Sequence, residues 1–424
     1  MKDVIELAYR WLDRQMFRAS QIELSQATKS LAAWPDWQLS VGGLPLAQLE
    51  DGVRAYIGSG LTIPIEIRCG QSRELIYTAQ AWIEHRSLRR SMGLVLAKLP
   101  AVLAKAQLVA QTRPQSLPGP ATQLRSASPA PSSSFRLIYQ LLRDAIRSVL
   151  MREQWVLAVG RWGDKTDKFL VTAVIEPPGD RFWADPFVTE LAGKRWLLFE
   201  ELVFKENRGK IAAVELGEQG QIIGSPRLVL DLPYHLSYPF LLEDAGKLYM
   251  IPESSANRTV DLYVNGGSIE TWTKVATLLS GERWADATVI QYEGKWWMFA
   301  ARGDAGASIF DELVIFWAHD LLGPWQAHAA NPVKIDAQTV RPAGAMWVED
   351  GALHRVVQDC SARYGAGVRV QRVTELSATS FFEEDLGPIS WDGSSEFFGL
   401  HTLSTFGSTA CVDLLRRIPV FDLI

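Results

Sequence analysis

Cysteine is scarce in this chain. The 424 residues include three cysteines, Cys69, Cys360 and Cys411, which lie far apart in the sequence. A disulfide framework needs more cysteines, and a zinc site needs ligands in close pairs, so neither is expected. The sequence therefore predicts no metal ligands, and a reducing cytoplasm is the expected location.

Several other features are also lacking. The 43 Lys and Arg residues are outnumbered by 48 Asp and Glu residues, and the net charge of −5 argues against a nucleic-acid partner. Charges interrupt the apolar pattern of the first seventeen residues, so no signal peptide is expected, and no other stretch is long and apolar enough to suggest a membrane span. There is no phosphate-cradling glycine loop, Ser-His-Asp motif or HExxH motif, so the cofactor is unknown.

What the sequence does contain is a repeated hairpin pattern. Residues 181–202 read as a strand opened by Asp-Pro, a turn with a central glycine at 191–194, and a second aromatic and aliphatic strand. The pattern returns with turns at 244–247, 292–295 and 349–351, and in degenerate form at 405–408. A spacing of about fifty residues is typical of four-stranded propeller blades. The sequence thus predicts a mainly β protein with a five-bladed β-propeller.

The remaining chain divides as follows. Residues 1–110 are expected to form a small α/β accessory domain with helices at 4–17 and 88–108, strands at 63–67 and 75–83, and a break or kink at Pro100. Residues 111–134 are Pro- and Ser-rich, which is typical of a flexible linker. The propeller is placed at 153–424. Its ring is expected to close by pairing the strand at 155–159 with the strand at 410–416.

An amphipathic helix is predicted at 135–152, between the linker and the propeller. Its apolar residues recur with helical spacing and it carries four arginines. A basic amphipathic helix can lie on an anionic membrane. It can equally pack on the propeller or on a partner subunit, so the sequence leaves a peripheral membrane contact and a protein contact both open.

Five short runs carry a resemblance to a known family: WADPF, SYPF followed by MIPES, WADAT, RPAG and GLHTLSTFG. Together they resemble bacterial relatives of the N-terminal domain of plant glucosamine inositolphosphorylceramide transferase, over about residues 155–418. That resemblance implies a five-bladed propeller similar to arabinanase and β-xylosidase-type glycosidases. More weakly, residues 60–110 resemble the end of a formyltransferase-like domain. The catalytic Asn-His-Asp set of that domain is not identifiable, so formyl transfer is not predicted.

The resemblance to the glycosidases implies three carboxylates around the central channel: a base, an acid and a third that tunes the acid. Asp185 matches the Asp-Pro base, and Asp286 occupies the equivalent point of the third unit. Glu253 ends a strand instead of opening one. Tyr238 replaces the aspartate in the second unit, which departs from the glycosidase pattern. An aspartate at a strand start can instead cap the backbone as an Asx turn.

Further candidates for substrate binding lie near the starts of the repeated hairpins. Arg341 could hold a carboxylate or phosphate, or form a buried ion pair with the aspartate of a neighbouring unit. Aromatic faces can stack on sugar rings, although packing between blades explains them as well, and a lone histidine is often structural. The substrate-binding candidates are Trp183, Glu200, Tyr238, Trp284, Arg341 and His401.

Two functions follow from these observations. The first is a carbohydrate-active propeller, glycosidase-like or glycosyl-transferring, that acts on a cell-surface glycan or glycolipid precursor. The second is a non-catalytic glycan-binding propeller that serves a partner enzyme in polysaccharide assembly. The sequence leaves open whether the protein is an enzyme, which sugar it takes and whether a calcium ion sits in the channel.

Overall fold

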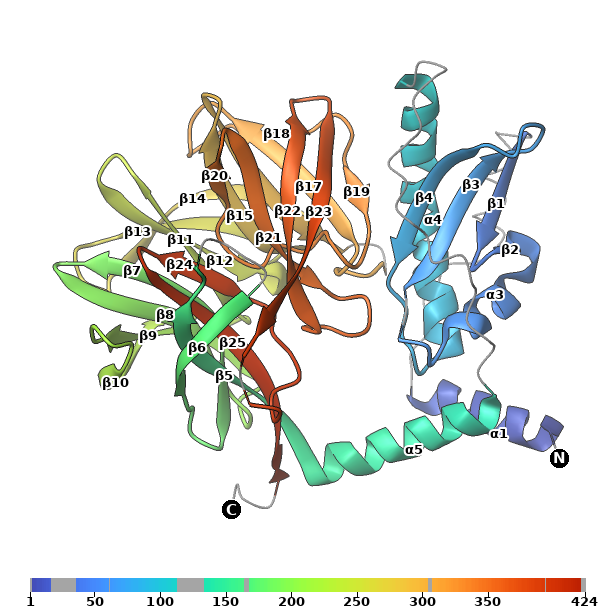
Figure 1. The fold of residues 1–424 in the computed structure, drawn as a ribbon, viewed down its shortest axis with the longest axis horizontal. Helices are drawn as coiled ribbons and strands as arrows, with labels where there is room; N and C mark the ends of the chain where they lie inside the picture. The colour runs from blue at the N-terminus through green and yellow to red at the C-terminus, as the bar shows by residue number, and fades with distance from the viewer. Residues whose placement is uncertain are drawn as a thin grey trace. The chain divides into compact units, whose positions relative to one another are not determined.

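The computed structural model describes residues 2–16, 36–60, 62–112, 133–163, 168–303, 307–392 and 394–420. Most of the expected linker, residues 113–132, lies outside them. The chain forms two compact units (Figure 1). Unit 1 comprises Met1–Ser148 with Gly303–Glu312 and Pro332–Ala337, and unit 2 comprises Val149–Arg302, Leu313–Asn331 and Gln338–Ile424.

Unit 1 is built on one antiparallel sheet with the strand order β2-β1-β3-β4. In β3, Ile63, Ile65 and Ile67 are all fully buried, because alternate residues of a strand point to the same face. Helices complete the apolar core. The elements are α1 (Lys2–Met16), β1 (Trp37–Val41), β2 (Leu44–Pro45), η1 (Leu46–Gln48), α3 (Leu49–Tyr56), β3 (Ile63–Cys69), β4 (Leu75–Ala81), α4 (Leu88–Thr112) and α5 (Ser134–Leu150, whose last two residues belong to unit 2).

Helix α4 departs from two expectations. It continues through Pro100 without interruption, and its apolar face, which includes Leu99 and Val102, is buried in the unit 1 core. Its segment Leu88–Gln111 is also long and apolar enough to cross a membrane by length and composition, which the sequence analysis did not expect. Half of that apolar window is buried within the protein, and α4 packs against β4. The burial of this face accounts for the apolar composition of α4.

Unit 2 consists of sheets whose strands pair antiparallel, except at one short parallel contact. Three stand alone, with orders β10-β9-β8-β7, β11-β12-β13-β14 and β15-β16-β17-β18, the last also bonded to β19. The fourth is eight-stranded, with the order β20-β21-β22-β23-β6-β5-β25-β24. It joins two four-stranded sets through a parallel contact of only two residue pairs, between β23 and β6.

The strands of unit 2 are β5 (Met151–Arg161), β6 (Lys168–Ile175), β7 (Arg181–Leu191), β8 (Lys194–Val203), β9 (Arg208–Leu216), β10 (Ile222–Leu230), β11 (Ser237–Asp244), β12 (Lys247–Ser254), β13 (Thr259–Asn265), β14 (Trp272–Ser280), β15 (Trp284–Tyr292), β16 (Lys295–Arg302), β17 (Glu312–Ala318, whose first residue belongs to unit 1), β18 (Gln326–Ala327), β20 (Trp347–Glu349), β21 (Ala352–Asp359), β22 (Gly367–Leu376), β23 (Phe381–Trp391), β24 (Leu403–Phe406) and β25 (Thr409–Pro419). The short β19 (Lys334–Ile335) belongs to unit 1, and the turn η3 (Ser255–Asn257) follows β12.

The predicted hairpins are confirmed by the strand pairing, and their turns explain why the sequence signal was clear. Four of them turn on two residues, the second always a glycine. Both turn residues have positive φ, for example 53° at Ala192 and 71° at Gly193. This is the geometry of a type I′ turn, which matches the twist of the strands and favours glycine.

The predicted pairing of the first and last strands of unit 2 is also confirmed. β5 and β25 pair antiparallel from Gly160↔Ala410 to Met151↔Pro419. β25 thereby lies between β5 and β24 in the sheet. A strand from each end of unit 2 therefore covers the edge that the other would expose.

Candidate functional site

Three of the repeated hairpins share an unusual backbone conformation near the start of their first strand. Asp185, Tyr238 and Asp286 have φ values of 53°, 43° and 54°, in the left-handed region. Each lies where the register of its hairpin shifts, which marks a bulge. A non-glycine residue costs about 1–2 kcal/mol in this conformation. Such strain is concentrated at functional sites, and here it turns the backbone at the same point of three successive sheets.

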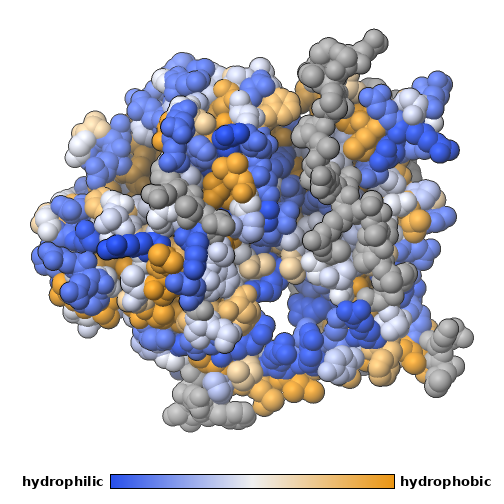
Figure 2. All heavy atoms as spheres, viewed as in Figure 1, coloured by the Kyte–Doolittle hydropathy of each residue, from blue (hydrophilic) through white to orange (hydrophobic). Residues whose placement is uncertain are grey.

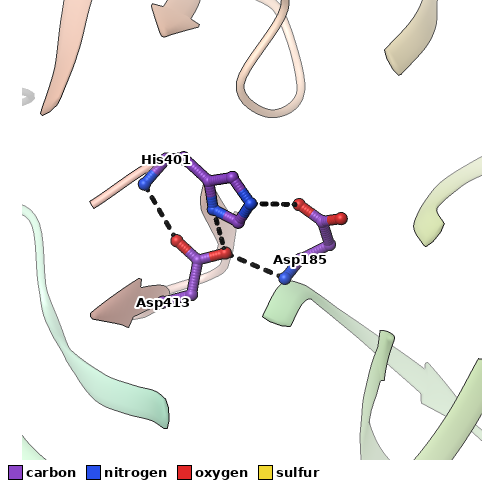
Figure 3. A group of neighbouring side chains, drawn as sticks. All are labelled: Asp185, His401 and Asp413. Carbon is purple, nitrogen blue, oxygen red and sulfur yellow. Dashed lines mark hydrogen bonds and ion pairs between the residues drawn. The ribbon is translucent and has the colours of Figure 1, made fainter. Parts of the chain in front are cut away.

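The first of these residues belongs to a buried group of three, Asp185, His401 and Asp413 (Figure 3). The His401 ring lies between the two carboxylates. Its Nδ1 is 2.5 Å from Oδ2 of Asp413, and its Nε2 is 3.6 Å from Oδ1 of Asp185. Asp413 also accepts backbone N–H hydrogen bonds from Asp185, His401 and Thr402, at 2.9, 3.0 and 2.9 Å. Asp413 thus fixes both the ring and the backbone around it.

Asp185 is held from two further sides. Its Oδ1 accepts a hydrogen bond from Thr402 Oγ1 at 2.6 Å, and its Oδ2 accepts one from the backbone N–H of Tyr238 at 3.1 Å. Burial raises the pKa of Asp185 to about 7. The His401 charge opposes this, and the negative charges of Asp413 and Asp286 add to it. A carboxyl with this pKa exchanges its proton near neutral pH.

His401 is enclosed by aromatic rings. Trp155 stacks on it with the ring centroids 4.1 Å apart, and Tyr364 meets it edge-on at 5.1 Å. Burial alone would lower the pKa of His401, but Asp413 and then Asp185 outweigh burial and raise the pKa to about 9. The ring therefore carries a positive charge at neutral pH.

Arg341 organises a second group, which contains the other two predicted carboxylates. Its Nε donates to Asp286 Oδ2 at 2.5 Å, and its Nη2 lies 3.5 Å from Glu253 Oε2. Gln358 Nε2 donates to the same Asp286 oxygen at 2.9 Å. The guanidinium also lies 5.0 Å from the ring centroid of Tyr364, the residue that contacts His401 in the first group. Tyr364 thus connects the two groups.

Glu253 differs from the other carboxylates in charge and exposure. Burial and then the charge of Asp286 raise its pKa well above its usual value, although Arg341 opposes them. Its side chain is 13% exposed, against 2% for Asp286, 5% for Asp185 and none for Asp413. Its raised pKa favours the protonated form, and Glu253 is the most exposed carboxyl of the two groups.

The structure brings together Asp185, Glu253, Asp286, Arg341 and His401, and it places the other predicted residues differently. Tyr238 offers its backbone to Asp185, while its side chain is buried and its hydroxyl bonds to Thr288 at 2.8 Å. Trp183 donates to Glu201, and Trp284 is 5% exposed in an apolar cluster. Glu200 lies 3.2 Å from His235 Nε2 and close enough to Asp185 for its negative charge to help raise the pKa of Asp185.

Sequence reasoning missed several residues of the site. Asp413 is the one acidic residue of β25 and stands among apolar neighbours, and that contrast was the available signal. Thr402 stands beside the predicted His401, but no pattern marks its hydroxyl. Gln358 lies at the end of β21, and Tyr364 follows that strand by five residues. Only the folded chain brings the two side chains to Arg341.

Among the residues that the structure describes, one group could hold a metal ion. Ligand atoms of Asp185, His401 and Asp413 lie within 4.8 Å of one another, whereas the sequence predicted no metal ligands. The donor chemistry, two carboxylates and an imidazole, suits a divalent cation. However, the three side chains already bond to one another, to Thr402 and to backbone N–H groups. A cation would have to displace these bonds, so the group as it stands fits proton sharing better.

The fold and site define a mainly β protein with a buried acidic centre whose residues come from several sheets. The family model described as "Glucosamine inositolphosphorylceramide transferase 1, N-terminal" matches residues 172–392, more than half of the chain. The chain belongs to this family. The match lies entirely within the range predicted for the propeller.

Curated relatives come from plants. Glucosamine inositolphosphorylceramide transferase 1 of Oryza sativa subsp. japonica is 30% identical over 205 residues, 48% of this chain and 27% of the relative. The Arabidopsis thaliana protein of the same name is 27% identical over 282 residues, 60% of this chain and 37% of the relative. The matches thus span well under half of these relatives. A bacterial source stays a prediction that these plant proteins do not test.

Solved structures with a similar chain trace are distant in sequence. The catalytic domain of a GH62 α-L-arabinofuranosidase from Coprinopsis cinerea has a TM-score of 0.43 and 12% identity, and the match covers 58% of this chain and 94% of that one. A thermostable family-43 glycoside hydrolase has a TM-score of 0.39 and 15% identity, with 49% and 75% covered. At these scores the likeness is remote.

Proposed function

We propose that unit 2 is a closed five-bladed β-propeller. Three four-stranded sheets stand alone, and the eight-stranded sheet divides naturally at its two-pair parallel contact into two more sets of four. The pairing of β5 with β25 supplies the closure that propellers use. Asp185, Glu253 and Asp286 come from three separate sheets, and Arg341 and His401 lie in the segments before β20 and β24 of the eight-stranded sheet, as residues around a central channel would.

We further propose that this propeller is carbohydrate-active and cleaves or transfers a glycosyl unit of a glycan or glycolipid precursor. The observation that carries the proposal is the pair of buried carboxyls, Asp185 and Glu253, whose pKa values are both raised by burial. Asp185 has a pKa of about 7, while Glu253 has a pKa raised well above its usual value. A raised pKa lets a carboxyl take up or give up a proton closer to neutral pH, which an acid and a base in glycosyl transfer must do.

The two carboxyls take complementary roles in this scheme. Glu253 gives its proton to the glycosidic oxygen as the bond from that oxygen to the anomeric carbon breaks. Asp185, ionised, takes the proton of the attacking water or acceptor hydroxyl as the new bond forms. Asp286, held by Arg341 and Gln358, raises the pKa of Glu253 through its negative charge. His401 and Thr402 orient Asp185.

The test is turnover of a panel of glycosides and nucleotide sugars by the purified chain. Asp185→Asn and Glu253→Gln should each lower turnover at least about 100-fold, because each removes an acid–base group. Glu243→Gln is the matched control, since Glu243 is exposed on β11, beside the strand that carries Glu253. Unchanged turnover in both site variants would contradict the proposal.

One observation favours a second function, a non-catalytic glycan-binding propeller that serves a partner enzyme. A cavity of about 290 Å³ is lined by Trp391, Asp359 and Ser361, among others, and by none of the predicted site residues. Its volume is at the lower end of ligand pockets, about 300–1,000 Å³. An aromatic ring beside a carboxylate and a hydroxyl suits a single sugar ring. Sugar binding that Trp391→Ala abolishes, without turnover of any glycoside, would support this function.

We propose a cytoplasmic location. Its support is the presence of free cysteines, of which Cys360 and Cys411 are buried with pKa values that burial raises to about 12. Thiols with such pKa values are inert. Fractionation of cells that express the tagged chain would test the location.

A further inference from the structure

Helix α5 has two apolar faces. Leu137 and Leu141 are each 1% exposed and pack in the core of unit 1. A second set of apolar side chains on the same helix is open to solvent. It consists of Phe135, Tyr139, Leu142 and Ile146, which are 69%, 60%, 52% and 60% exposed, and is called here the exposed stripe.

The exposed stripe follows helical geometry. Its members are four, three and four residues apart, so at about 100° per residue they lie on one side of the helix. Arg136, Arg143 and Arg147 are exposed and fall together along one flank of the stripe. With Asp144 as the only acidic residue, α5 carries a net charge of +2, in a chain whose net charge is −5. The stripe is thus an apolar and basic surface on an acidic protein.

Helix α1 of the same unit repeats the arrangement. Tyr9 and Asp13 are buried, whereas Val4, Leu7 and Trp11 are 68%, 67% and 61% exposed along one face. The two helices meet, because Ser134 Oγ at the start of α5 donates to Glu6 Oε2 of α1. Figure 2 shows apolar surface along the edge of the molecule where Figure 1 draws α5. Both helices therefore present an apolar face without a partner among the described residues.

We infer that α1 and α5 form a surface that docks on an anionic lipid bilayer. Apolar side chains flanked by arginines match the acyl boundary and the negative headgroups of such a bilayer. Trp11 and Tyr139, with an apolar body and a polar tip, suit the interface between lipid and water. A second copy of this chain fits less well, because the arginine flanks would then face each other. The inference rests on these helices and not on the proposed glycan chemistry.

The experiment is sedimentation of the full chain with vesicles. Vesicles of about 30% phosphatidylglycerol in phosphatidylcholine should bind the protein, and pure phosphatidylcholine vesicles should bind it at least about tenfold more weakly, since each arginine near an anionic surface contributes about a fivefold factor. Analytical ultracentrifugation of the same samples without lipid measures self-association.

Two double variants divide the surface into its apolar and basic parts. Leu142→Ser with Ile146→Ser removes half of the exposed stripe, and Arg143→Gln with Arg147→Gln removes two charges. Each should weaken binding at least about tenfold. Ile223→Ser with Leu228→Ser on β10 is the apolar control, because these side chains are 48% and 54% exposed.

Arg89→Gln with Arg90→Gln is the charge control, because both arginines are exposed on α4 of the same unit. Neither control should change binding. Absence of binding to the anionic vesicles, or equal loss in variants and controls, would overturn the inference. Concentration-dependent dimers that the stripe variant abolishes, without vesicle binding, would also overturn it and assign the surface to self-association. If the stripe variant does not fold, vesicle binding of the arginine variant still tests the inference.

Discussion

Units 1 and 2 each bury a cation between two carboxylates, but the cations differ. In unit 1, Lys98 Nζ lies 2.7 Å from both Asp311 Oδ1 and Glu312 Oε1, and all three side chains are at most 6% exposed. In unit 2 the cation is His401, between Asp185 and Asp413. The groups resemble each other in burial and charge, so the comparison isolates the chemistry of the cation.

The difference is the pH at which each cation gives up its proton. Burial lowers the pKa of Lys98, but Asp311 and Glu312 outweigh burial and raise it, away from neutrality. His401 and Asp185 have pKa values of about 9 and 7. Lys98 therefore stays positively charged at neutral pH, and its group serves stability. The histidine group can move protons, which is why we place function in unit 2.

The largest expected effect is on the lysine group. Lys98→Met leaves two carboxylates buried without their cation, which should lower the free energy of unfolding by about 3–5 kcal/mol. Urea unfolding followed by circular dichroism measures it. Lys247→Met on β12 is the control, because Lys247 is exposed and the substitution should change stability by less than about 1 kcal/mol. Equal effects in the two variants would show that Lys98 has no special role.

Asp413→Asn should have the next largest effect. It removes the charge that faces His401 and that accepts three backbone hydrogen bonds, and should destabilise unit 2 by about 3 kcal/mol. The pKa of His401, followed by NMR titration, should fall below about 9. The matched control is Asp231→Asn, which removes a surface ion pair with Arg208. It should lower the free energy of unfolding by less than about 1 kcal/mol. An unchanged His401 titration would contradict the assigned contact.

The pH dependence of stability sharpens the comparison. A raised folded-state pKa means that the stabilisation is complete below the unfolded pKa and is lost as the pH rises through the folded pKa. For His401 that window runs from about 6.5 to about 9, with a loss of up to about 3 kcal/mol. Unfolding midpoints measured across this window should fall, and His401→Gln should flatten the profile. A flat profile in the unsubstituted protein would contradict a charged His401.

The smallest effect concerns the hydroxyl that holds Asp185. Thr402→Val removes the donor to Asp185 Oδ1 and should cost about 1–2 kcal/mol. It should also raise the pKa of Asp185 further, because the hydrogen bond favours the charged form. Any pH–rate profile that depends on Asp185 should then shift to higher pH. Thr405→Val, at an exposed position of β24, should change neither quantity.

The sequence predicted the hairpins well, because their cause is local. A two-residue turn with both φ values positive requires glycine at its second position, and that glycine recurs in the sequence at 193, 246, 294 and 351. The site was less predictable. Asp185, Asp286 and Glu253 were proposed from their positions in the repeat, but their partners depend on contacts across sheets.

The missed residues share a physical reason. Asp413 is the one acidic residue of β25, and Lys98 lies within an apolar stretch of α4. The sequence does not say which distant group neutralises each. Lys98 pairs with residues more than 200 positions away. Such contacts arise only when the whole chain has folded, so neither periodicity nor turn chemistry could reveal them.

The pairing of β5 with β25 has a consequence for synthesis on the ribosome. Arg416 of β25 bonds to Gln154 of β5, 262 residues earlier, and β25 also carries the carboxylate that orients His401. Until that last strand has left the exit tunnel, β5 has an open edge and the imidazole has no anchor. A nascent chain halted before residue 409 would hold most of its sheets and still be unable to assemble its proton-handling centre.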